Sequence, residues 1–237
     1  MGANFITGTG TDIGKTWLAC ALLRHWRVAG RPVTAFKPVL SGFDPQQPQA
    51  SDAGALLAAL GREASAAELD AIAPWRYAAP LSPDMAAARE GRRIDFDELV
   101  AFTRRVVSAN SGPTLVEGVG GVMVPVDDRH TVRDWIAASA LPCVLVAGSY
   151  LGSLSHTLTA LEALARVGAG VTAIAVNQTP DSAVTLDATL DSLARHVVGI
   201  PLVSIARDSP RAGVARLAGM LCPETVQAVY CAPLSPL

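Results

Sequence analysis

The sequence predicts an α/β fold in which a mostly parallel sheet is covered by helices on both faces. Two patterns indicate this fold. Short, nearly continuous apolar runs alternate with longer segments whose apolar residues recur at helical spacing, and such unbroken runs are typical of parallel strands buried on both sides. The 237 residues contain no Pro-, Gly- or Ser-rich linker, so we expect one domain over residues 1–237, with a loose tail at Ala232–Leu237.

The first half of the chain is expected to alternate strands with helices that begin at capping residues. Ser51 and Asp95 each precede a helical pattern as an N-cap does, and Pro83 suits the first turn of another helix. The expected elements are a strand at Ala3–Thr7, a helix at Trp17–Ala29 that ends at Gly30, a strand at Pro32–Val39, a helix at Ser51–Leu60, a short irregular strand within Ala71–Tyr77, and helices at Ser82–Glu90 and Asp95–Asn110.

The second half continues the same alternation. Its strands are short runs rich in β-branched residues, and Ser153 is expected to cap the longest of its helices. The expected elements are a strand at Thr114–Val116, a helix at Thr131–Ala138, a strand at Cys143–Ala147, a helix at Ser153–Val167, a strand at Val171–Asn177, a helix at Ser182–His196, and a final strand and helix between Val197 and Leu221.

The composition excludes several classes of partner. Only 17% of the residues are charged and the formal net charge is −2, which argues against binding to nucleic acid or to an anionic membrane surface. No apolar run approaches the roughly 18 residues that cross a bilayer, and the first strand begins too early to leave room for a signal peptide. The four cysteines form no Cys-x-x-Cys pair. We therefore expect a cytoplasmic protein with reduced thiols, and no membrane or nucleic-acid partner.

A glycine-rich loop, Gly8–Thr16 (GTGTDIGKT), lies between the first strand and the first helix. This is the layout of a phosphate-binding P-loop, whose backbone N–H groups and helix N-terminus hold polyphosphate oxygens. Lys15 is then expected to neutralise the outer phosphates, and the Thr16 hydroxyl to reach a Mg²⁺ ion. The strict pattern has glycine where Thr9 stands, so this is either a P-loop one residue longer or a plain glycine-rich turn. The strand before it and the helix after it favour the nucleotide loop.

The use of basic residues singles out two lysines. Seventeen of the nineteen basic residues are arginine, and only Lys15 and Lys37 are lysine. A compact ammonium acting on a phosphate is a position where a guanidinium is a poor substitute. Lys37 lies near the carboxyl end of the second predicted strand, and ligands of parallel sheets gather at that edge.

Other polar residues lie at the ends of predicted elements, and each has a structural alternative. Glu117 ends its strand as a Walker-B acid does and could reach a metal ion on the phosphates, or it caps a turn. The glycines at 118, 120 and 121 would let a ligand approach the backbone. Asp52 is either a second oxygen ligand of the metal ion or an acid that only stabilises the N-terminus of its helix. Spacing alone favours the structural role. Asn177 contacts adenine or ends a turn, and Ser153 binds an anion or caps its helix.

Taken together, these stretches resemble the dethiobiotin synthetase family, and the resemblance covers most of the chain. The seven-residue spacing from Gly8 to Lys15, which departs from the strict Walker pattern, is the family's own. The matching stretches are Thr7–Thr16 (TGTGTDIGKT), Phe36–Gly42 (FKPVLSG), Ser51–Ala53 (SDA), Leu81–Gly91 (LSPDMAAAREG), Leu115–Gly121 (LVEGVGG), Leu151–His156 (LGSLSH) and Val176–Asn177 (VN).

The resemblance implies a homodimeric, Mg²⁺-dependent, ATP-using cyclo-ligase of biotin synthesis. Its small-molecule partners would be ATP, CO₂ and 7,8-diaminononanoate (7,8-diaminopelargonate). One amine captures CO₂ as a carbamate, the carbamate accepts the γ-phosphoryl group, and the second amine closes the ureido ring of dethiobiotin and releases phosphate.

The resemblance also implies which residues form the site. Lys15 and Lys37 are the implied catalytic residues, and Thr16, Asp52 and Glu117 are the implied Mg²⁺ ligands. The implied ATP contacts are Asp12, Ile13, Gly14, Lys15, Thr16, Trp17, Asp52, Glu117, Gly118, Val119, Gly120, Asn177, Gln178, Pro201, Leu202 and Val203. The implied substrate contacts are Thr11, Ser41, Leu151, Gly152, Ser153 and Ser155. The last four would lie at a helix N-terminus that receives the carboxylate of the substrate bound to the other subunit.

Two other classes of protein share parts of this pattern. A P-loop ATPase switch of the partition or septum-positioning type acts on DNA or a membrane, but it carries an additional lysine early in its loop, where this chain has Thr9-Gly10-Thr11. An amidotransferase-type synthetase usually carries a glutaminase domain, for which this chain has no room. The ligase is therefore the favoured interpretation, with the switch as its alternative.

Overall fold

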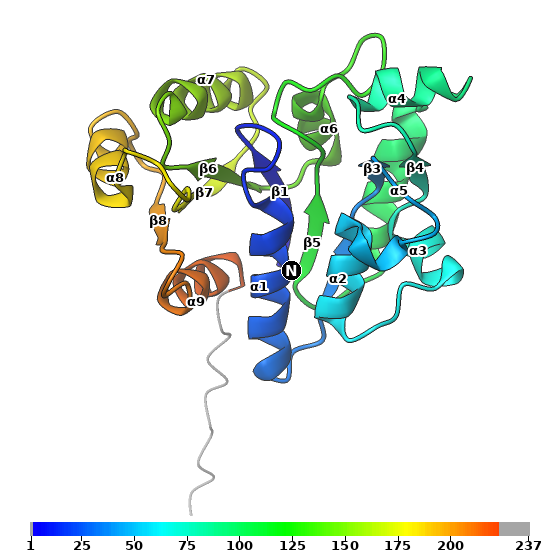
Figure 1. The fold of residues 1–237 in the computed structure, drawn as a ribbon, viewed down its shortest axis with the longest axis horizontal. Coiled ribbons are helices and arrows are strands. Elements are labelled where there is room, and N and C mark those ends of the chain that lie inside the picture. Colours follow the sequence, from blue (N-terminus) through cyan, green and yellow to red (C-terminus); the bar gives the residue numbers. More distant parts are fainter. Residues whose placement is uncertain (1, 223–237) are drawn as a thin grey trace, which may run out of the picture.

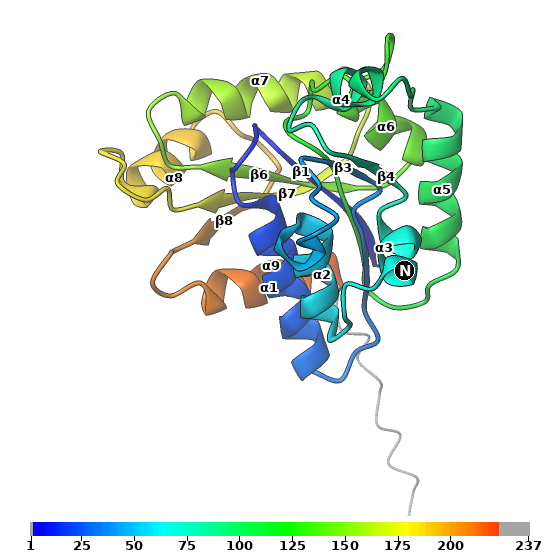
Figure 2. The same cartoon turned by 45° about the vertical axis from the view of Figure 1, so that its right-hand side comes forward.

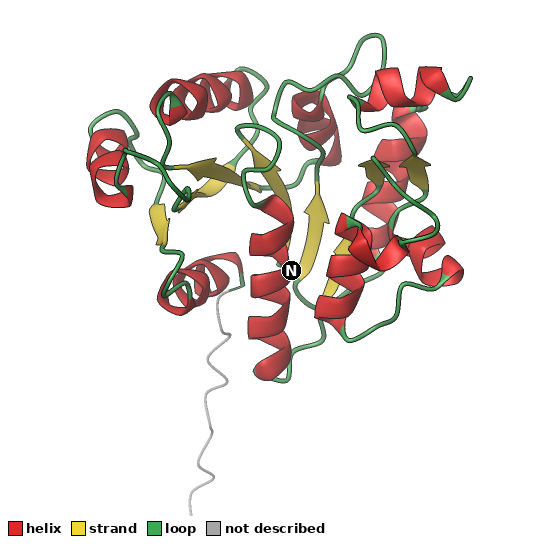
Figure 3. Ribbon diagram, viewed as in Figure 1, coloured by secondary structure: helices red, strands yellow, loops and turns green. Residues whose placement is uncertain are grey.

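The computed structural model describes residues 2–222, and the tail predicted at Ala232–Leu237 lies outside them. The central feature is a six-stranded sheet in the order β2-β5-β1-β6-β7-β8, and every pair of neighbours is parallel. Its strands are β1 (Ala3–Gly8), β2 (Thr34–Phe36), β5 (Thr114–Glu117), β6 (Cys143–Gly148), β7 (Val171–Asn177) and β8 (Leu202–Ile205). The predicted parallel α/β fold is confirmed, and the helices alternate with these strands along the chain (Figure 3).

Helices cover both faces of the sheet, as Figures 1 and 2 show. Successive side chains of a strand point to opposite faces, so Val144 and Val146 enter one core and Leu145 enters the other. The first core contains residues of α1 (Lys15–Val28), α2 (Asp52–Leu60), α3 (Ala66–Ile72) and α9 (Arg211–Leu221). The second contains residues of α4 (Pro83–Arg89), α5 (Phe96–Ser108), α6 (Val132–Ser139), α7 (Ser153–Ala165) and α8 (Leu186–Ala194).

The strand predicted at Pro32–Val39 is divided in two, which corrects the prediction. β2 ends at Phe36, and β3 (Val39–Ser41) pairs instead with β4 (Trp75–Tyr77) in a separate two-stranded parallel sheet. Pro38 has no backbone N–H to donate, so the ladder cannot continue through it. The backbone N–H of Lys37 donates to Ile72 O at 2.9 Å instead. Lys37 therefore lies at a bend between the two sheets.

Most predicted helix starts are confirmed by their caps. Ser51 Oγ accepts a hydrogen bond from Gly54 N at 3.1 Å, and Asp95 Oδ1 accepts from Glu98 N at 3.0 Å. Two starts were wrong. The N-cap of α7 is Gly152, at φ 98°, rather than Ser153, and α8 begins after Thr185 rather than at Ser182. The structure also contains α3 and a short 3₁₀ helix at Pro48–Ala50, neither of which was predicted.

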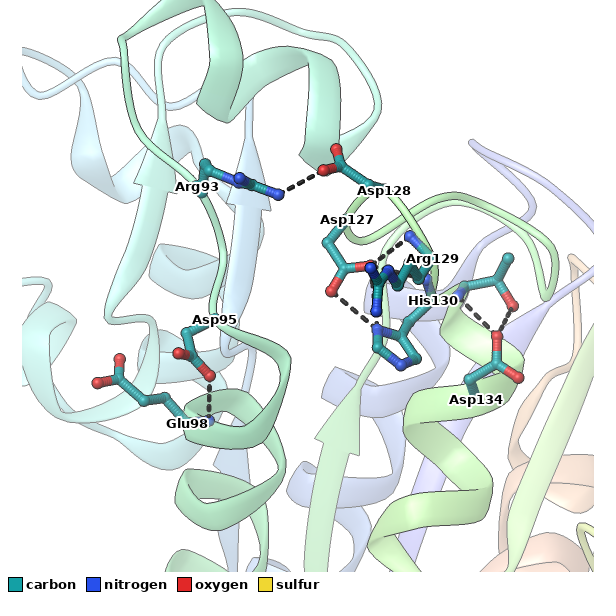
Figure 4. Close-up of polar contacts among 9 residues, drawn as sticks. Arg93, Asp95, Glu98, Asp127, Asp128, Arg129, His130 and Asp134 are labelled. Atoms are coloured by element: carbon teal, nitrogen blue, oxygen red, sulfur yellow. Dashed lines mark hydrogen bonds and ion pairs between the residues drawn. The ribbon is translucent and has the colours of Figure 1, made fainter.

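The long connection between β5 and α6 is held by a tight polar turn, drawn in Figure 4. Asp127 accepts hydrogen bonds from the backbone N–H groups of Arg129 and His130, and its carboxylate lies 2.9 Å from His130 Nδ1. The His130 ring stacks on Phe96, with 3.8 Å between ring centroids. Thr131 and Asp134 then form a capping box at the start of α6. These contacts fix the segment that follows Glu117 and leads into α6.

Among residues 2–222, no helix is both long enough and apolar enough to span a bilayer.

Candidate active site

The predicted nucleotide loop joins β1 to α1, as the sequence indicated. The loop ends at Gly14, whose φ of 91° lies in the left-handed region that favours glycine. Lys15 is the first helical residue. The Lys15 ammonium turns back and donates to Gly10 O at 2.8 Å. A side chain at Gly8 would lie 3.2 Å from the Lys15 stem and 2.8 Å from Ile13, so a residue larger than glycine does not fit there. The loop therefore lies close against the Lys15 side chain, with the strand–loop–helix layout of a P-loop.

Four elements bring the remaining predicted residues together. The Thr16 hydroxyl, on α1, donates to Glu117 Oε1 at the end of β5, at 2.6 Å. Lys37, at the bend after β2, lies 2.7 Å from Glu117 Oε1 and 3.0 Å from Asp52 Oδ2 at the start of α2. Its ammonium also donates to Gly118 O at 2.9 Å. We call Lys15, Thr16, Lys37, Asp52 and Glu117 the acid–lysine cluster.

Burial and neighbouring charges set the protonation of the acid–lysine cluster. Burial alone would lower the pKa of Lys37, but the Glu117 and Asp52 carboxylates outweigh it, so its pKa is raised. Burial opposes ionisation of Asp52, yet the Lys37 ammonium keeps the pKa of Asp52 below its usual value. Both groups are therefore charged at neutral pH. For Lys15, burial and the positive charge of Lys37 together lower the pKa from 10.5 to about 8.

The lowered pKa of Lys15 predicts a pH limit on nucleotide binding. A bound triphosphate favours the charged amine, so binding raises the pKa and takes up a proton whenever the pH exceeds about 8. We expect the affinity for Mg·ATP to be nearly constant below pH 7.5 and about ten-fold weaker at pH 9. Calorimetric titrations across this range test the prediction. Affinity that stays flat to pH 10 would contradict it, and the variant Lys15→Met should lose the dependence.

The acid–lysine cluster offers ligands that suit Mg²⁺. Thr16, Asp52 and Glu117 present hydroxyl and carboxylate oxygens, the donors that this ion prefers. Glu117 Oε2 is buried and has no hydrogen-bond partner among residues 2–222, so it is free to accept a cation. Over the same residues, no three His, Cys, Asp or Glu side chains gather into a metal cage. The donors present therefore fit an ion that shares its coordination with phosphate oxygens and water.

A cavity of about 850 Å³ opens beside the acid–lysine cluster. The P-loop and the start of α1 form one wall, and Trp17 there is 46% exposed. Ser41 also lines this cavity, and its Oγ is buried without a partner among the described residues. The lining residues that the sequence predicted are Thr11, Asp12, Gly14, Lys15, Thr16, Trp17, Lys37, Ser41, Asp52, Val119 and Gly120.

A second cavity, of about 640 Å³, lies on the other side of the P-loop. Ile13, Asn177 and Gln178, which are three of the expected ATP contacts, line it. The Asn177 side chain donates through Nδ2 to Ile13 O at 2.8 Å, and its Oδ1 is buried without a partner in the described chain. Gln178 Oε1 accepts from Arg207 N at 3.0 Å.

The register of β8 bears on Pro201, Leu202 and Val203, which were expected to contact ATP. Leu202 pairs with Ile174 and Val203 with Ala175, whereas Ile205 pairs with Asn177. Residues 201–203 therefore lie toward the other edge of the sheet and do not line either cavity. The residues of this region that line the second cavity are Ile205 and Arg207.

Several lining residues were missed, and the four substrate contacts predicted around the start of α7 lie outside both cavities. The second cavity is also lined by Tyr150, Thr179 and Pro180, which follow the ends of β6 and β7. Their position after strand ends was the signal that could have found them. Leu151, Gly152, Ser153 and Ser155 line neither cavity, and Leu151 is 90% exposed at the start of α7.

A glycine-rich loop between a strand and a helix, with Lys-Thr at its end and a carboxylate on the neighbouring strand, defines a P-loop nucleotide-binding protein. A family described as "AAA domain" matches residues 3–207 of this chain. The chain is 51% identical, over 207 residues, to the ATP-dependent dethiobiotin synthetase BioD of Acidiphilium cryptum, an alignment that covers 87% of this chain and 93% of that protein. It is 42% identical to the protein of the same name from Phenylobacterium zucineum, over 92% and 94% of the two chains. The chain belongs to the dethiobiotin synthetase family, and the predicted resemblance is confirmed.

The fold alone does not separate this family from the alternative considered above. The septum site-determining protein MinD of Pyrococcus horikoshii superposes with a TM-score of 0.52, over 94% of this chain and 90% of its own, at 15% identity. Likeness at that identity shows a shared fold and nothing further. The sequence relatives therefore decide between the ligase and the switch.

Proposed function

We propose that this chain catalyses the ATP-dependent closure of 7,8-diaminononanoate and CO₂ to dethiobiotin, with release of ADP and phosphate. The observation that carries the proposal is the position of Lys37. Its side chain is 3% exposed, and its ammonium lies in contact with two carboxylates beside the P-loop. An anionic carbamate that attacks an anionic phosphoryl group needs a fixed cation between them, and Lys37 is suited to that role.

The phosphate end of the site is assigned to the P-loop. Lys15 would lie against the outer phosphates, and the backbone N–H groups of residues 12–16 would hold their oxygens. Thr16, Asp52 and Glu117 are the residues that would hold Mg²⁺, which supplies positive charge to the phosphate oxygens when bound. The unpartnered Glu117 Oε2 supports this assignment.

The reaction uses the larger cavity in three chemical steps. One amine of the diamine attacks CO₂ and loses a proton to give a carbamate. A carbamate oxygen then attacks the γ-phosphorus, and ADP leaves. The second amine attacks the carbamate carbon and loses a proton, phosphate leaves with the oxygen that carried it, and the ureido ring closes. Lys37 would neutralise the carbamate throughout, and Ser41 and Thr11 are suited to contact the diamine because both line this cavity.

The base would occupy the second cavity. Asn177 Oδ1 is suited to accept a hydrogen bond from the adenine amino group, since it is buried and unpartnered in the described chain. Gln178 is the other predicted contact on this side, and Ile205 and Arg207 take the place of residues 201–203.

We further propose a homodimer with shared sites. Leu151, Gly152, Ser153 and Ser155 form the start of a 13-residue helix whose first N–H groups can bind an anion. They line neither cavity of their own chain, and Ser153 Oγ is buried without a partner in residues 2–222. Their position outside both cavities, with Leu151 90% exposed, suits a role toward the substrate carboxylate of a second copy. The whole chain would act as one catalytic domain, in the cytoplasm.

Phosphate release tests the proposed function. Enzyme, ATP, Mg²⁺ and bicarbonate are incubated with and without 7,8-diaminononanoate. We expect release that depends on the diamine, together with a cyclic urea product identified by mass spectrometry. Release that is indifferent to the diamine but stimulated by DNA or lipid vesicles would contradict the ligase and support the partition-type switch.

A further inference from the structure

Asn177, at the end of β7, is attached to the phosphate-binding loop as well as to the base cavity. We propose that Asn177 is a positioning residue for the P-loop, and that its side-chain amide fixes the loop backbone at the Ile13–Gly14 peptide. The proposal rests on the proposed function only in that the loop binds nucleotide phosphates. It assigns Nδ2, the hydrogen-bond donor of Asn177, to the loop, and leaves Oδ1, the acceptor, for the base.

The contact that carries the proposal joins residues far apart in sequence. Asn177 Nδ2 donates to Ile13 O at 2.8 Å across a separation of 164 residues. A backbone carbonyl can only accept, so the amide nitrogen must be the atom that faces it. The orientation of the Asn177 amide is therefore determined by its partner, and its donor is committed to the loop.

The planarity of the peptide bond explains how this contact orients the loop. Ile13 C=O and Gly14 N–H belong to one trans peptide unit and point in opposite directions. Holding the carbonyl against Asn177 therefore turns the Gly14 N–H away from Asn177. Backbone N–H groups that are fixed in this manner are the ones that P-loops present to phosphate.

Gly14 is built to accept this contact. A Cβ at Gly14 would overlap Asn177 Nδ2, so any other residue there would displace the asparagine amide. The φ of 91° at Gly14 excludes other residues for a second, independent reason. The loop and the asparagine therefore fit together without space between them.

The backbone of Asn177 is itself anchored on both sides. It pairs with Gly148 of β6 and with Ile205 of β8, and its carbonyl accepts from Ser149 N at 3.1 Å. A short side chain on an anchored backbone has little freedom. The sheet therefore supplies a rigid support to a loop that would otherwise depend on its own glycines.

Ligands without a base separate positioning from base recognition. Wild type, Asn177→Ala and Asn177→Leu are compared for binding of Mg·tripolyphosphate and of Mg·ATP by calorimetry, and for hydrogen exchange of the P-loop peptides without ligand. Leucine keeps the volume of the side chain and removes its polar atoms, so it separates the lost donor from a new cavity. Asn110→Ala is the matched control. Asn110 Nδ2 also donates to a backbone carbonyl, at 2.7 Å, but that carbonyl belongs to Val106 of α5 and not to the P-loop.

We expect both Asn177 variants to exchange the amides of residues 9–14 about ten-fold faster than wild type. We also expect them to bind Mg·tripolyphosphate about ten-fold more weakly, a loss of about 1.4 kcal/mol. Asn110→Ala should match wild type in both measurements. Unchanged loop exchange and unchanged tripolyphosphate binding, with weaker ATP binding, would show that Asn177 contacts only the base and would overturn the proposal. If tripolyphosphate does not bind wild type measurably, the exchange rates decide alone. Neither readout uses the diamine, so failure of the ligase reaction would leave this result intact.

Discussion

Lys37→Met should lower the rate of dethiobiotin formation by at least about 10³-fold while Mg·ATP still binds. The physical reason is that the methionine keeps most of the volume of the side chain but removes the cation that, in the proposed reaction, lies between the phosphoryl group and the carbamate. Mass spectrometry of the product measures the rate of dethiobiotin formation, and calorimetry measures the binding of Mg·ATP. A second effect should accompany the loss: the charge of Lys37 helps to lower the pKa of Lys15, so the pH limit on ATP binding should move upward.

The same substitution leaves buried Glu117 without its ion-pair partner, which costs about 3–5 kcal/mol of stability. Thermal unfolding therefore has to accompany the assay, and Mg²⁺ should stabilise the variant more than wild type. Arg24→Met removes an exposed cation from α1, away from the acid–lysine cluster, and serves as the control, with activity expected within about two-fold of wild type. Full activity of Lys37→Met would remove this lysine from the mechanism.

Glu117→Gln should raise the Mg²⁺ concentration needed for half-maximal rate by at least about ten-fold, and lower the maximal rate by about 10²-fold. Glutamine keeps the shape and an oxygen acceptor for Thr16 and Lys37, but it removes the negative charge that the metal ion requires. Initial rates over a Mg²⁺ titration at fixed ATP measure both quantities.

Glu98→Gln is the matched control for Glu117→Gln, because Glu98 is an exposed acid in the first turn of α5. It should leave the Mg²⁺ dependence unchanged. A Glu117→Gln enzyme with the Mg²⁺ dependence of wild type would mean that this carboxylate only neutralises Lys37 and supports the strand end.

The nucleotide loop and the acid–lysine cluster could be predicted from the sequence because of how parallel strands are arranged. Gly8, Lys37 and Glu117 all lie at or just beyond the carboxyl end of a strand, and those ends share one edge of the sheet. The scarcity of lysine supported the same prediction, since the two lysines of the chain both lie in the cluster. Asp52 could not be assigned in the same manner, because an acid at the start of a helix also has a purely local explanation.

The residues around the base could not be predicted, because a single sequence does not show which residues of neighbouring strands pair with one another. Residues 201–203 lie at the start of β8 (Leu202–Ile205), but only the pairing of Ile205 with Asn177 shows that the chain reaches the cavity two to four residues later. The division of the strand at Pro38 and the cap at Gly152 were missed for a related reason. Each depends on a backbone property, a missing donor or a positive φ, that the apolar pattern does not record.

The fate of the oxygen atoms of CO₂ tests the central claim most directly. A brief reaction started with C¹⁸O₂, ATP, Mg²⁺ and the diamine is stopped before CO₂ exchanges with water, and both products are weighed by mass spectrometry. If the carbamate is phosphorylated at the acid–lysine cluster, phosphate carries one ¹⁸O atom and the ureido carbonyl carries the other. Phosphate without ¹⁸O, released while dethiobiotin forms, would show that the γ-phosphoryl group never reaches the carbamate and would contradict this account.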